Sequence, residues 1–276
     1  MKKIDLHNHS NYSDGESSFQ ELLDLAIEKK ISFFSITDHN YISPEQDKFR
    51  ALAEKKGIFF IQGIEVSCID KETGQSLHIL GYSNSFKIEK INEALDHIIQ
   101  GYNNRAKKII GKLNKKYGAD FNFEKIKNET LAVYVSRNHL IKKLSEFLGN
   151  KLSQKELLQE VFIEEDNSWM PDSFEAIKII HKYGGIAVLA HPGNIIKKDR
   201  FEELIAKLVK NGLKGIEVYY PKHNEVVVEI LKNTSNKFNL IQTGGSDWHG
   251  QSFSKKEIGI DAPDEIYSKL QEIFKK

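Results

Sequence analysis

Histidine and acidic residues recur in this chain where short apolar runs end, and such positions can gather side chains for chemistry. His7 and His9 close an apolar run and are two residues apart, so on a strand they point to the same face. Two imidazoles placed in this way can hold one divalent ion. The other candidates lie at later strand ends, on a turn or within a strand: Asp14, His39, Glu65, His78, His191, Asp247 and His249.

These nine residues predict a cluster of ions rather than a single ion. Imidazole mixed with carboxylate suits Mn, Fe or Zn. Nine ligands are too many for one ion, since tetrahedral zinc takes about four. We therefore expect two or three divalent ions, with Glu65 or Asp247 as a bridge. His97, His181 and His223 lie in helical patterns and are expected to have structural roles.

Strands and helices that alternate along the chain must position these residues. Ser18 with Glu21 predicts one helix start, and a helical run over Glu175–Tyr183 ends at Gly184. The alternation predicts a parallel sheet, and barrels of parallel strands carry their active sites at the carboxyl ends of the strands. Seven strands are expected, at Ile4–Leu6, Phe33–Thr37, Ile58–Val66, Leu77–Tyr82, Gly185–Ala190, Gly215–Tyr219 and Leu240–Thr243.

Residues 88–172 break this alternation. They place Ile, Leu and Phe at helical spacing with many lysines between them, and they contain no convincing buried strand. We expect a discontinuous α/β barrel domain formed by residues 1–87 and 173–276. Residues 88–172 are then a mostly helical insertion that serves as a lid or recognises substrate.

Two features of the sequence bear on nucleic acid. The basic run from Arg105 to Lys116 carries its apolar residues on one stripe, so its lysines are expected to form a solvated face. Contact with the phosphates of a short oligonucleotide is the alternative. Trp169, Tyr219 and Tyr220 either stack on a base or belong to the core and its rim.

Composition limits the class of protein. The 276 residues carry 40 basic and 39 acidic side chains, so the large basic excess of a nucleic-acid coat protein is absent. The single cysteine, Cys68, excludes an intrachain disulfide and favours a reducing compartment. The N-terminus lacks the apolar stretch of a signal peptide, and no run approaches the ~18 apolar residues that span a bilayer. We expect a cytoplasmic globular protein with no membrane partner and no obligate protein partner.

Taken together and in order, the polar motifs resemble those of the PHP family, named for polymerases and histidinol phosphatases. The resemblance runs to about residue 250 and implies a distorted (β/α)7 barrel, a bi- or trinuclear metal site and phosphoester hydrolysis. The matching stretches are Asp5-Leu6-His7-Asn8-His9-Ser10, Ser13-Asp14-Gly15, Thr37-Asp38-His39, Gly63-Ile64-Glu65, Leu77-His78, Ala190-His191-Pro192 and Gly245-Ser246-Asp247-Trp248-His249-Gly250.

The resemblance also implies which residues hold which ion. One ion takes His7, His9, Glu65 and Asp247; a second takes Glu65, His78 and His191; a third takes Asp14, His39 and His249. The chain is most similar to standalone bacterial phosphoesterases acting on nucleoside monophosphates, nucleoside 3′,5′-bisphosphates or short RNA 5′ ends. Their helical insertion carries an Arg-x-His motif near the metals. Arg137-Asn138-His139 fits this motif, so Arg137 and His139 are expected to bind substrate.

The expected reaction is metal-assisted hydrolysis of a nucleotide phosphomonoester. A hydroxide that bridges two ions attacks phosphorus, and Arg137 neutralises charge on the phosphoryl oxygens. His249 or a metal-bound water protonates the leaving group. Asp5 and Asp38 are expected either to accept the second N–H of a metal-bound imidazole or to cap strand ends.

Several alternatives stay open at this point. Two concern the substrate: a 5′-3′ exoribonuclease acting on short RNA, and a histidinol-phosphate-type phosphatase. Two concern the class: a metal-dependent amidohydrolase, and a non-catalytic PHP binding module. Amidohydrolases usually bridge their metals with a carboxylated lysine, and no strand-end lysine is apparent here. The complete set of ligand positions disfavours a binding module.

Overall fold

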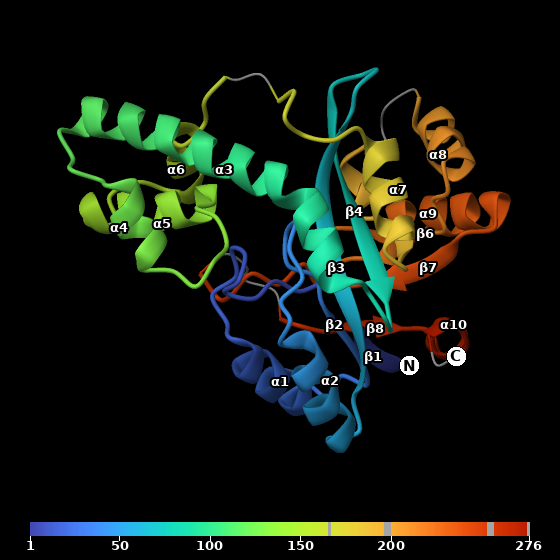
Figure 1. Cartoon of the computed structure of the whole chain (residues 1–276). Coiled ribbons are helices and arrows are strands. Elements are labelled where there is room, and N and C mark those ends of the chain that lie inside the picture. The colour runs from blue at the N-terminus through green and yellow to red at the C-terminus, as the bar shows by residue number, and fades with distance from the viewer. Residues whose placement is uncertain (165–166, 196–199, 253–256, 275–276) are drawn as a thin grey trace.

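The computed structural model describes residues 1–164, 167–195, 200–252 and 257–274, and its centre is one curled sheet (Figure 1). The strand order is β7-β6-β5-β4-β3-β2-β1-β8. Just past β1, the N–H of Leu6 donates to the carbonyl of Gly244 in β7 at 3.0 Å, which brings the sheet close to a closed barrel. The strands are β1 (Lys2–Asp5), β2 (Phe33–Ile36), β3 (Phe59–Asp70), β4 (Gln75–Ser83), β5 (Ile186–Leu189), β6 (Gly215–Tyr219), β7 (Ile241–Gly244) and β8 (Ile260–Ala262).

All seven expected strands are present, and the expected α/β barrel is confirmed, but two features differ from the prediction. β4 runs antiparallel to both β3 and β5. Only residues 71–74 join β3 to β4, which is too short for the crossover that a parallel pair requires. The eighth strand, β8, pairs antiparallel with β1 and was not expected. Its three residues are too few to show the alternation that marks a strand.

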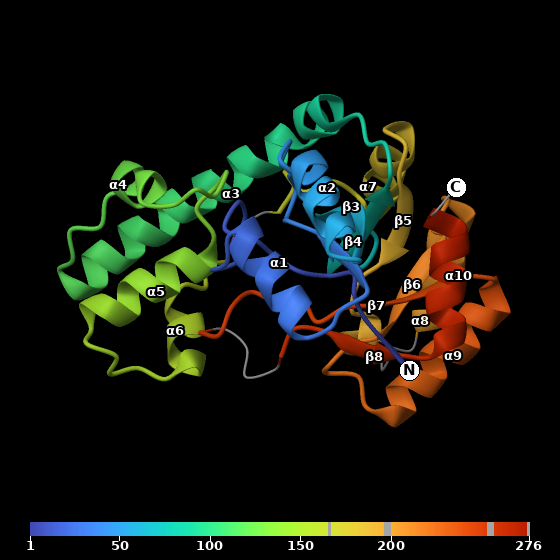
Figure 2. The ribbon, with the colours of Figure 1, turned by 90° about the horizontal axis from the view of Figure 1, so that it is seen from below.

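Helices cover the outside of the barrel. The expected helix start is confirmed at α1, where Ser18 and Glu21 form a reciprocal capping box. The expected stop after α7 is confirmed at Gly184, whose φ of +95° favours glycine. In Figures 1 and 2, α8, α9 and α10 lie together on the right-hand side. These helices are α1 (Phe19–Glu28), α2 (Gln46–Lys55), α7 (Ser173–Lys182), α8 (Phe201–Lys210), α9 (Glu225–Phe238) and α10 (Asp264–Phe274).

The described part of residues 88–172 is helical and contains no strand, as expected. Its helices are α3 (Ile88–Tyr117), α4 (Phe123–Asn128), α5 (Arg137–Phe147) and α6 (Gln154–Glu160). The first half of α3 buries Leu95 and Ile98 in the core beside β3, β4 and α7, whereas the second half buries Ile109 and Leu113 in a separate core with α4–α6. One continuous helix therefore joins the barrel to the other helices (Figure 1). Among the described residues, no helix has the length and apolarity to cross a bilayer.

Candidate metal centre and substrate cavity

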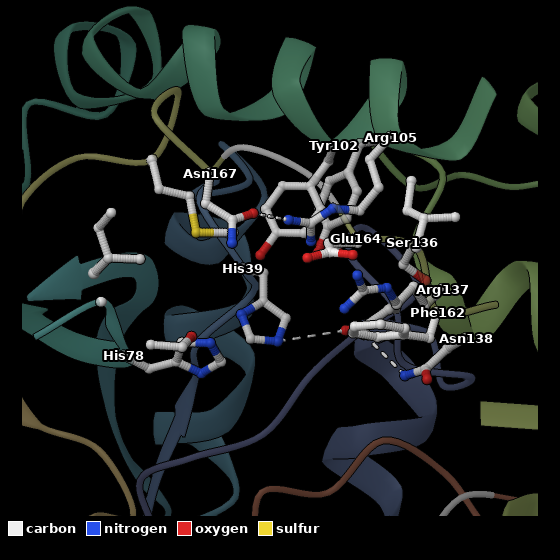
Figure 3. Close-up of a pocket in the computed structure, with 17 residues that line it drawn as sticks. His39, His78, Tyr102, Arg105, Ser136, Arg137, Asn138, Phe162, Glu164 and Asn167 are labelled. Carbon is white, nitrogen blue, oxygen red and sulfur yellow. Dashed lines mark hydrogen bonds and ion pairs between the residues drawn. The ribbon is translucent and has the colours of Figure 1, made fainter. Parts of the chain in front are cut away.

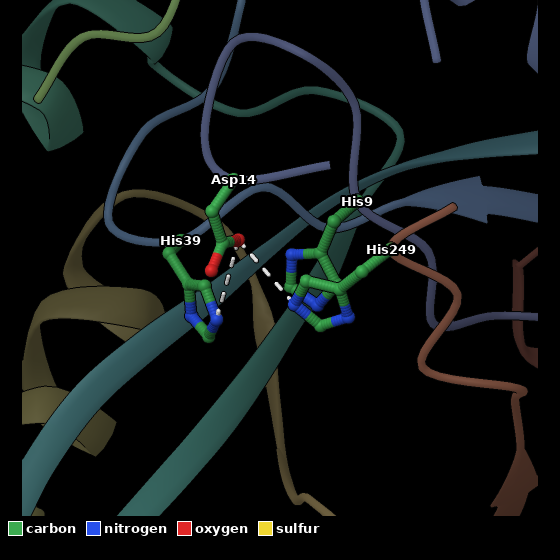
Figure 4. Close-up of side chains that lie close together, drawn as sticks. All are labelled: His9, Asp14, His39 and His249. Carbon is green, nitrogen blue, oxygen red and sulfur yellow. Dashed lines mark ion pairs between the residues drawn. The ribbon is translucent and has the colours of Figure 1, made fainter. Parts of the chain in front are cut away.

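The nine expected metal ligands meet in one cluster at the rim of the barrel. His7, His9 and Asp14 follow β1, His39 follows β2, Glu65 and His78 lie in β3 and β4, His191 follows β5, and Asp247 and His249 follow β7. Eight of them form three overlapping groups, and within each group the ligand atoms lie within 4.8 Å of one another; the ninth, His191, lies outside these groups, with Nε2 3.1 Å from Oε1 of Glu65. The groups are His7, His9, Glu65 and Asp247; His9, Asp14, His39 and His249 (Figure 4); and His39, Glu65 and His78.

Glu65 is the centre of this cluster. Its side chain is fully buried, and the peptide of β3 that carries it is held by pairing with β4. Five imidazole nitrogens lie 2.8–3.2 Å from one of its two oxygens, those of His7, His9, His39, His78 and His191. A carboxylate that faces imidazoles on both of its oxygens is suited to bridge two ions; that either Glu65 or Asp247 does so stays a prediction.

The buried ligand atoms fit metal ions. Several of them have no hydrogen bond to any other described residue: Nε2 of His7 and His9, Nδ1 of His39, Oδ1 of Asp14 and Oε2 of Glu65. A buried polar atom without a hydrogen bond costs about 1–3 kcal/mol. Divalent ions would satisfy these atoms and would balance carboxylates that are held close together and out of water.

Protonation of the cluster reflects its packed charges. Burial alone lowers the pKa of His249, but Asp14 and Asp247 outweigh it and raise that pKa to about 10. Burial dominates at His39 and lowers its pKa to about 3. Burial would raise the pKa of the Glu65 carboxyl, yet the facing imidazoles of His7, His78 and His39 hold it well below its usual value. Protons therefore occupy part of the cluster when no metal is bound.

The groups in the structure overlap with those that the resemblance implies, but they are not identical. The group around His7, His9, Glu65 and Asp247 is the same. His78 is grouped with His39 rather than His191, although Nε2 of His191 lies 3.1 Å from Oε1 of Glu65. His9 joins the group around Asp14. The assignment of residues to individual ions stays a prediction.

Asp5 and Asp38 cap chain segments. Asp5 accepts the backbone N–H groups of Ser246 at 2.9 Å and Gly259 at 2.7 Å. Asp38 accepts the hydroxyls of Ser10 and Ser13, both at 2.6 Å, and so shapes the loop that presents Asp14. The idea that either one accepts an imidazole N–H is wrong for the described residues, because their oxygens are aimed at main-chain and hydroxyl donors.

Glu217, which was not predicted from the sequence, faces His7 where one of those two aspartates was expected. Its buried side chain lies in β6, with Oε1 3.1 Å from Nδ1 of His7, and Oε2 accepts the backbone N–H of His191 at 2.7 Å. A signal was present. Gly215-Ile216-Glu217-Val218 repeats the sequence of Gly63-Ile64-Glu65-Val66 in a second barrel strand.

Three of the four histidines outside the cluster have structural roles, as expected. His97 contacts the carbonyl of Ala94, and His181 contacts the carbonyls of Gly185 and Gly212. His223 lies in the turn before α9 rather than in a helix, and its Nδ1 is 2.9 Å from the carbonyl of Val218.

A cavity of about 420 Å³ opens between the cluster and the insertion (Figure 3). Asp14, His39 and His78 line the barrel side. Tyr102, Arg105, Tyr134, Arg137, Asn138 and Phe162 line the insertion side. The start of α5 is tied to the cluster directly, because Nδ2 of Asn138 donates to Oδ2 of Asp14 at 2.9 Å. Arg137 is therefore brought to the edge of the candidate metal centre.

Not every residue expected near substrate faces this cavity. Nδ1 of His139 accepts the N–H of Ser136 at 3.0 Å and so caps α5, and His139 does not line the cavity. The Trp169 ring packs on the guanidinium of Arg105, 4.8 Å from the ring centre, and the Tyr220 hydroxyl donates to Asp247 at 3.0 Å. Tyr219 packs between two hydrophobic cores.

The fold and the site together define a metal-dependent hydrolase, since a barrel rim of imidazoles and carboxylates is suited to activate water. Comparison with known families matches residues 5–238 to the PHP domain. The chain therefore belongs to the PHP domain family, as the motifs predict.

Relatives of known function cover almost the whole chain. A phosphoribosyl 1,2-cyclic phosphate 1,2-diphosphodiesterase of Eggerthella lenta is 27% identical over 94% of this chain and 98% of its own. A 3′,5′-nucleoside bisphosphate phosphatase of Chromobacterium violaceum is 25% identical over 94% and 91%. A 5′-3′ exoribonuclease of Haemophilus influenzae is 28% identical over 90% of each chain. The predicted class, a metal-dependent phosphoesterase, is confirmed.

Solved structures agree with the fold. A protein of Bifidobacterium adolescentis described as a metal-dependent phosphoesterase superposes with a TM-score of 0.82 at 20% identity, covering 97% of this chain and 95% of that one. A protein of Chromobacterium violaceum described as an amidohydrolase superposes with a TM-score of 0.79 at 23% identity, covering 96% of each chain.

Proposed function

We propose that this phosphoesterase hydrolyses a phosphomonoester of a nucleotide, either a nucleoside monophosphate or a nucleoside 3′,5′-bisphosphate. The observation that carries the proposal is the cavity beside the metal cluster. Its lining includes Arg137, whose neighbour Asn138 is hydrogen-bonded to Asp14 of the cluster, and the aromatic side chain of Phe162. A nucleotide has groups that match both, a phosphate for the guanidinium and a flat base for the aromatic ring.

The nine clustered residues are the proposed ligands of two or three divalent ions, which we take to be Mn, Fe or Zn. When bound, such ions polarise the phosphoryl group and make a nucleophile of water near neutral pH. Arg137 is proposed to hold the phosphoryl oxygens, because a planar guanidinium can donate two parallel hydrogen bonds to them. His249, whose Nε2 lies 3.3 Å from Oδ1 of Asp14, is the proposed source of the proton for the leaving oxygen in the state with two bound ions, in which it is not a ligand and keeps that proton.

Phe162 is the proposed platform for the base. It lines the cavity, and its side chain is 61% exposed, so the face of its ring is accessible to a bound base. Stacking of a base on an aromatic ring contributes about 1–3 kcal/mol. His139 was expected to bind substrate as well. Its Nδ1 instead accepts the N–H of Ser136 at the start of α5, which supports a role in holding Arg137 in place.

A single nucleotide is favoured over a longer RNA because two lysines of the basic run from Arg105 to Lys116 contact the insertion itself. Nζ of Lys112 donates to the carbonyls of Glu160 and Phe162, and Lys116 pairs with Glu160. These ammonium groups fasten α3 to α6.

We also propose that residues 88–172 act as the substrate-recognition element over the barrel formed by residues 1–87 and 173–276, since the insertion supplies one wall of the cavity.

The test is a hydrolysis screen of the Mn²⁺-loaded protein. It compares adenosine 5′-monophosphate, adenosine 3′,5′-bisphosphate, 5′-phosphorylated tetranucleotide RNA, phosphoribosyl 1,2-cyclic phosphate and histidinol phosphate, with an amide and a lactam as controls. The proposal expects the highest kcat/KM on a mononucleotide. A preference for RNA, for the cyclic phosphate or for histidinol phosphate would overturn the substrate, and turnover of only the amide or lactam would overturn the class.

A matched pair of variants tests the base platform. Phe162→Leu keeps an apolar side chain but removes the aromatic face, and Phe147→Leu makes the same change at an exposed residue of α5 that does not line the cavity. Phe162→Leu should raise KM for the mononucleotide by roughly tenfold, in keeping with 1–3 kcal/mol of stacking, and leave turnover of p-nitrophenyl phosphate unchanged. An equal KM in both variants would show that no base stacks there.

A further inference from the structure

One buried carboxylate outside the nine ligands contacts two of them. Glu217 in β6 is fully buried, and its two oxygens face different ligand residues that lie far apart in the sequence. Oε1 lies 3.1 Å from Nδ1 of His7, and Oε2 accepts the backbone N–H of His191 at 2.7 Å. We propose that Glu217 is a positioning residue of the metal centre, which fixes the tautomer of His7 and the backbone of His191; the inference rests on the proposed role of those two residues as ligands.

The contact with His7 decides which ring nitrogen can bind a metal. A carboxylate accepts hydrogen bonds, so Nδ1 of His7 carries the proton. In the neutral ring that binds a metal, Nε2 then keeps its lone pair, and it lies 3.2 Å from Oε2 of Glu65 and 3.5 Å from Oδ1 of Asp247, among the other ligand atoms. A metal-bound histidine commonly donates its other ring N–H to a carboxylate, and this partner sets ring orientation and basicity.

The contact with His191 holds a strained turn. His191 follows β5 with φ of +28° and ψ of 54°, a conformation that side chains other than glycine rarely adopt. Such a backbone costs about 1–3 kcal/mol and persists only where its surroundings hold it. The hydrogen bond from its N–H to Glu217 supplies that restraint. The turn brings Nε2 of His191 to 3.1 Å from Oε1 of Glu65.

Both contacts require a carboxylate rather than an amide. Glu217 accepts hydrogen bonds on both oxygens, whereas glutamine has one oxygen and an NH₂ group that only donates. In Glu217→Gln, the NH₂ group must face either Nδ1 of His7 or the N–H of His191. In the first case the His7 proton moves to Nε2 and blocks the metal-binding lone pair; in the second the strained turn at His191 loses its acceptor.

Metal titration of the full chain tests this inference without any substrate. Metal-free wild type, Glu217→Gln and the control Glu229→Gln, an exposed residue of α9 whose side chain is 64% accessible, are titrated with Zn²⁺ by calorimetry. We expect Glu217→Gln to bind Zn²⁺ about 10–100-fold more weakly than wild type, the usual cost of losing such a partner, and Glu229→Gln to match wild type. Affinity of Glu217→Gln within twofold of wild type would overturn the inference.

A second readout keeps the inference testable if Glu217→Gln does not fold. In ¹⁵N-labelled, Zn²⁺-loaded wild type, the imidazole of His7, assigned by its disappearance in His7→Gln, should carry its proton on Nδ1. A proton on Nε2 would contradict the inference. Wild type that binds Zn²⁺ with the expected tautomer but hydrolyses no phosphoester would overturn the proposed function alone.

Discussion

Replacing Glu65 by glutamine removes the negative charge at the centre of the candidate metal site while keeping the shape of the side chain. Its two oxygens face five imidazole nitrogens at 2.8–3.2 Å, and it belongs to two of the three ligand groups. Neither of the other two carboxylates, Asp14 and Asp247, belongs to more than one group. Glu65→Gln therefore changes two ion sites at once.

The size of the effect follows from Coulomb's law. At an effective dielectric of about 20, two unit charges 4 Å apart interact by about 4 kcal/mol. A change of about 1.4 kcal/mol is tenfold in an equilibrium constant. Loss of the Glu65 charge should therefore weaken binding of a divalent ion by at least about a thousandfold.

Calorimetric titration of metal-free Glu65→Gln with Mn²⁺, together with elemental analysis of the dialysed protein, measures this loss. Turnover of p-nitrophenyl phosphate should fall in parallel, and circular dichroism should report an intact fold. Glu175→Gln at the start of α7 makes the same change away from the cluster and serves as the control. Binding of a full complement of Mn²⁺ by Glu65→Gln with wild-type affinity would refute the reasoning.

Further variants and conditions test other parts of the account. Arg137→Ala should raise KM for phosphate esters with little change in metal content, as seen by steady-state kinetics; unchanged kinetics would exclude contact between Arg137 and the phosphoryl group. His191→Ala should nearly abolish phosphatase activity in a folded protein, and wild-type turnover would exclude it as a ligand. Gly101→Ala should destabilise the fold by roughly 1–3 kcal/mol in urea titrations, because the added Cβ would come within 2.1 Å of Cε3 of Trp169. Zn²⁺ affinity should rise with pH between 6 and 8, since carboxylates raise the pKa of His249 to about 10 and its proton must leave before a metal binds; calorimetry in two buffers of different ionisation enthalpy would detect that proton, and a pH-independent affinity would contradict the prediction.

Much of the site was predictable because most of the ligands lie in a barrel strand or just after one. Once His7 and His191 are placed at strand ends and Glu65 within its strand, the nearly closed sheet brings them together whatever their separation in sequence. The local patterns that mark strands were confirmed for all seven predicted strands, with ends that differ from the prediction by zero to four residues.

What the sequence did not reveal depends on contacts between distant residues. β8 has three residues and exists because Ile260 and Ala262 pair with β1. The antiparallel direction of β4 follows from the short link after Asp70. Glu217 was missed because its role depends on the side chain that it contacts. That side chain is His7, which is far away in the sequence.

The central claim is that side chains from both ends of the chain hold a shared cluster of divalent ions at the barrel rim. Anomalous diffraction from crystals grown with Mn²⁺ tests it most directly. The account predicts two or three manganese peaks among the nine residues, at least two of them contacting Glu65. An absence of peaks at the rim, or manganese bound only elsewhere on the molecule, would contradict it.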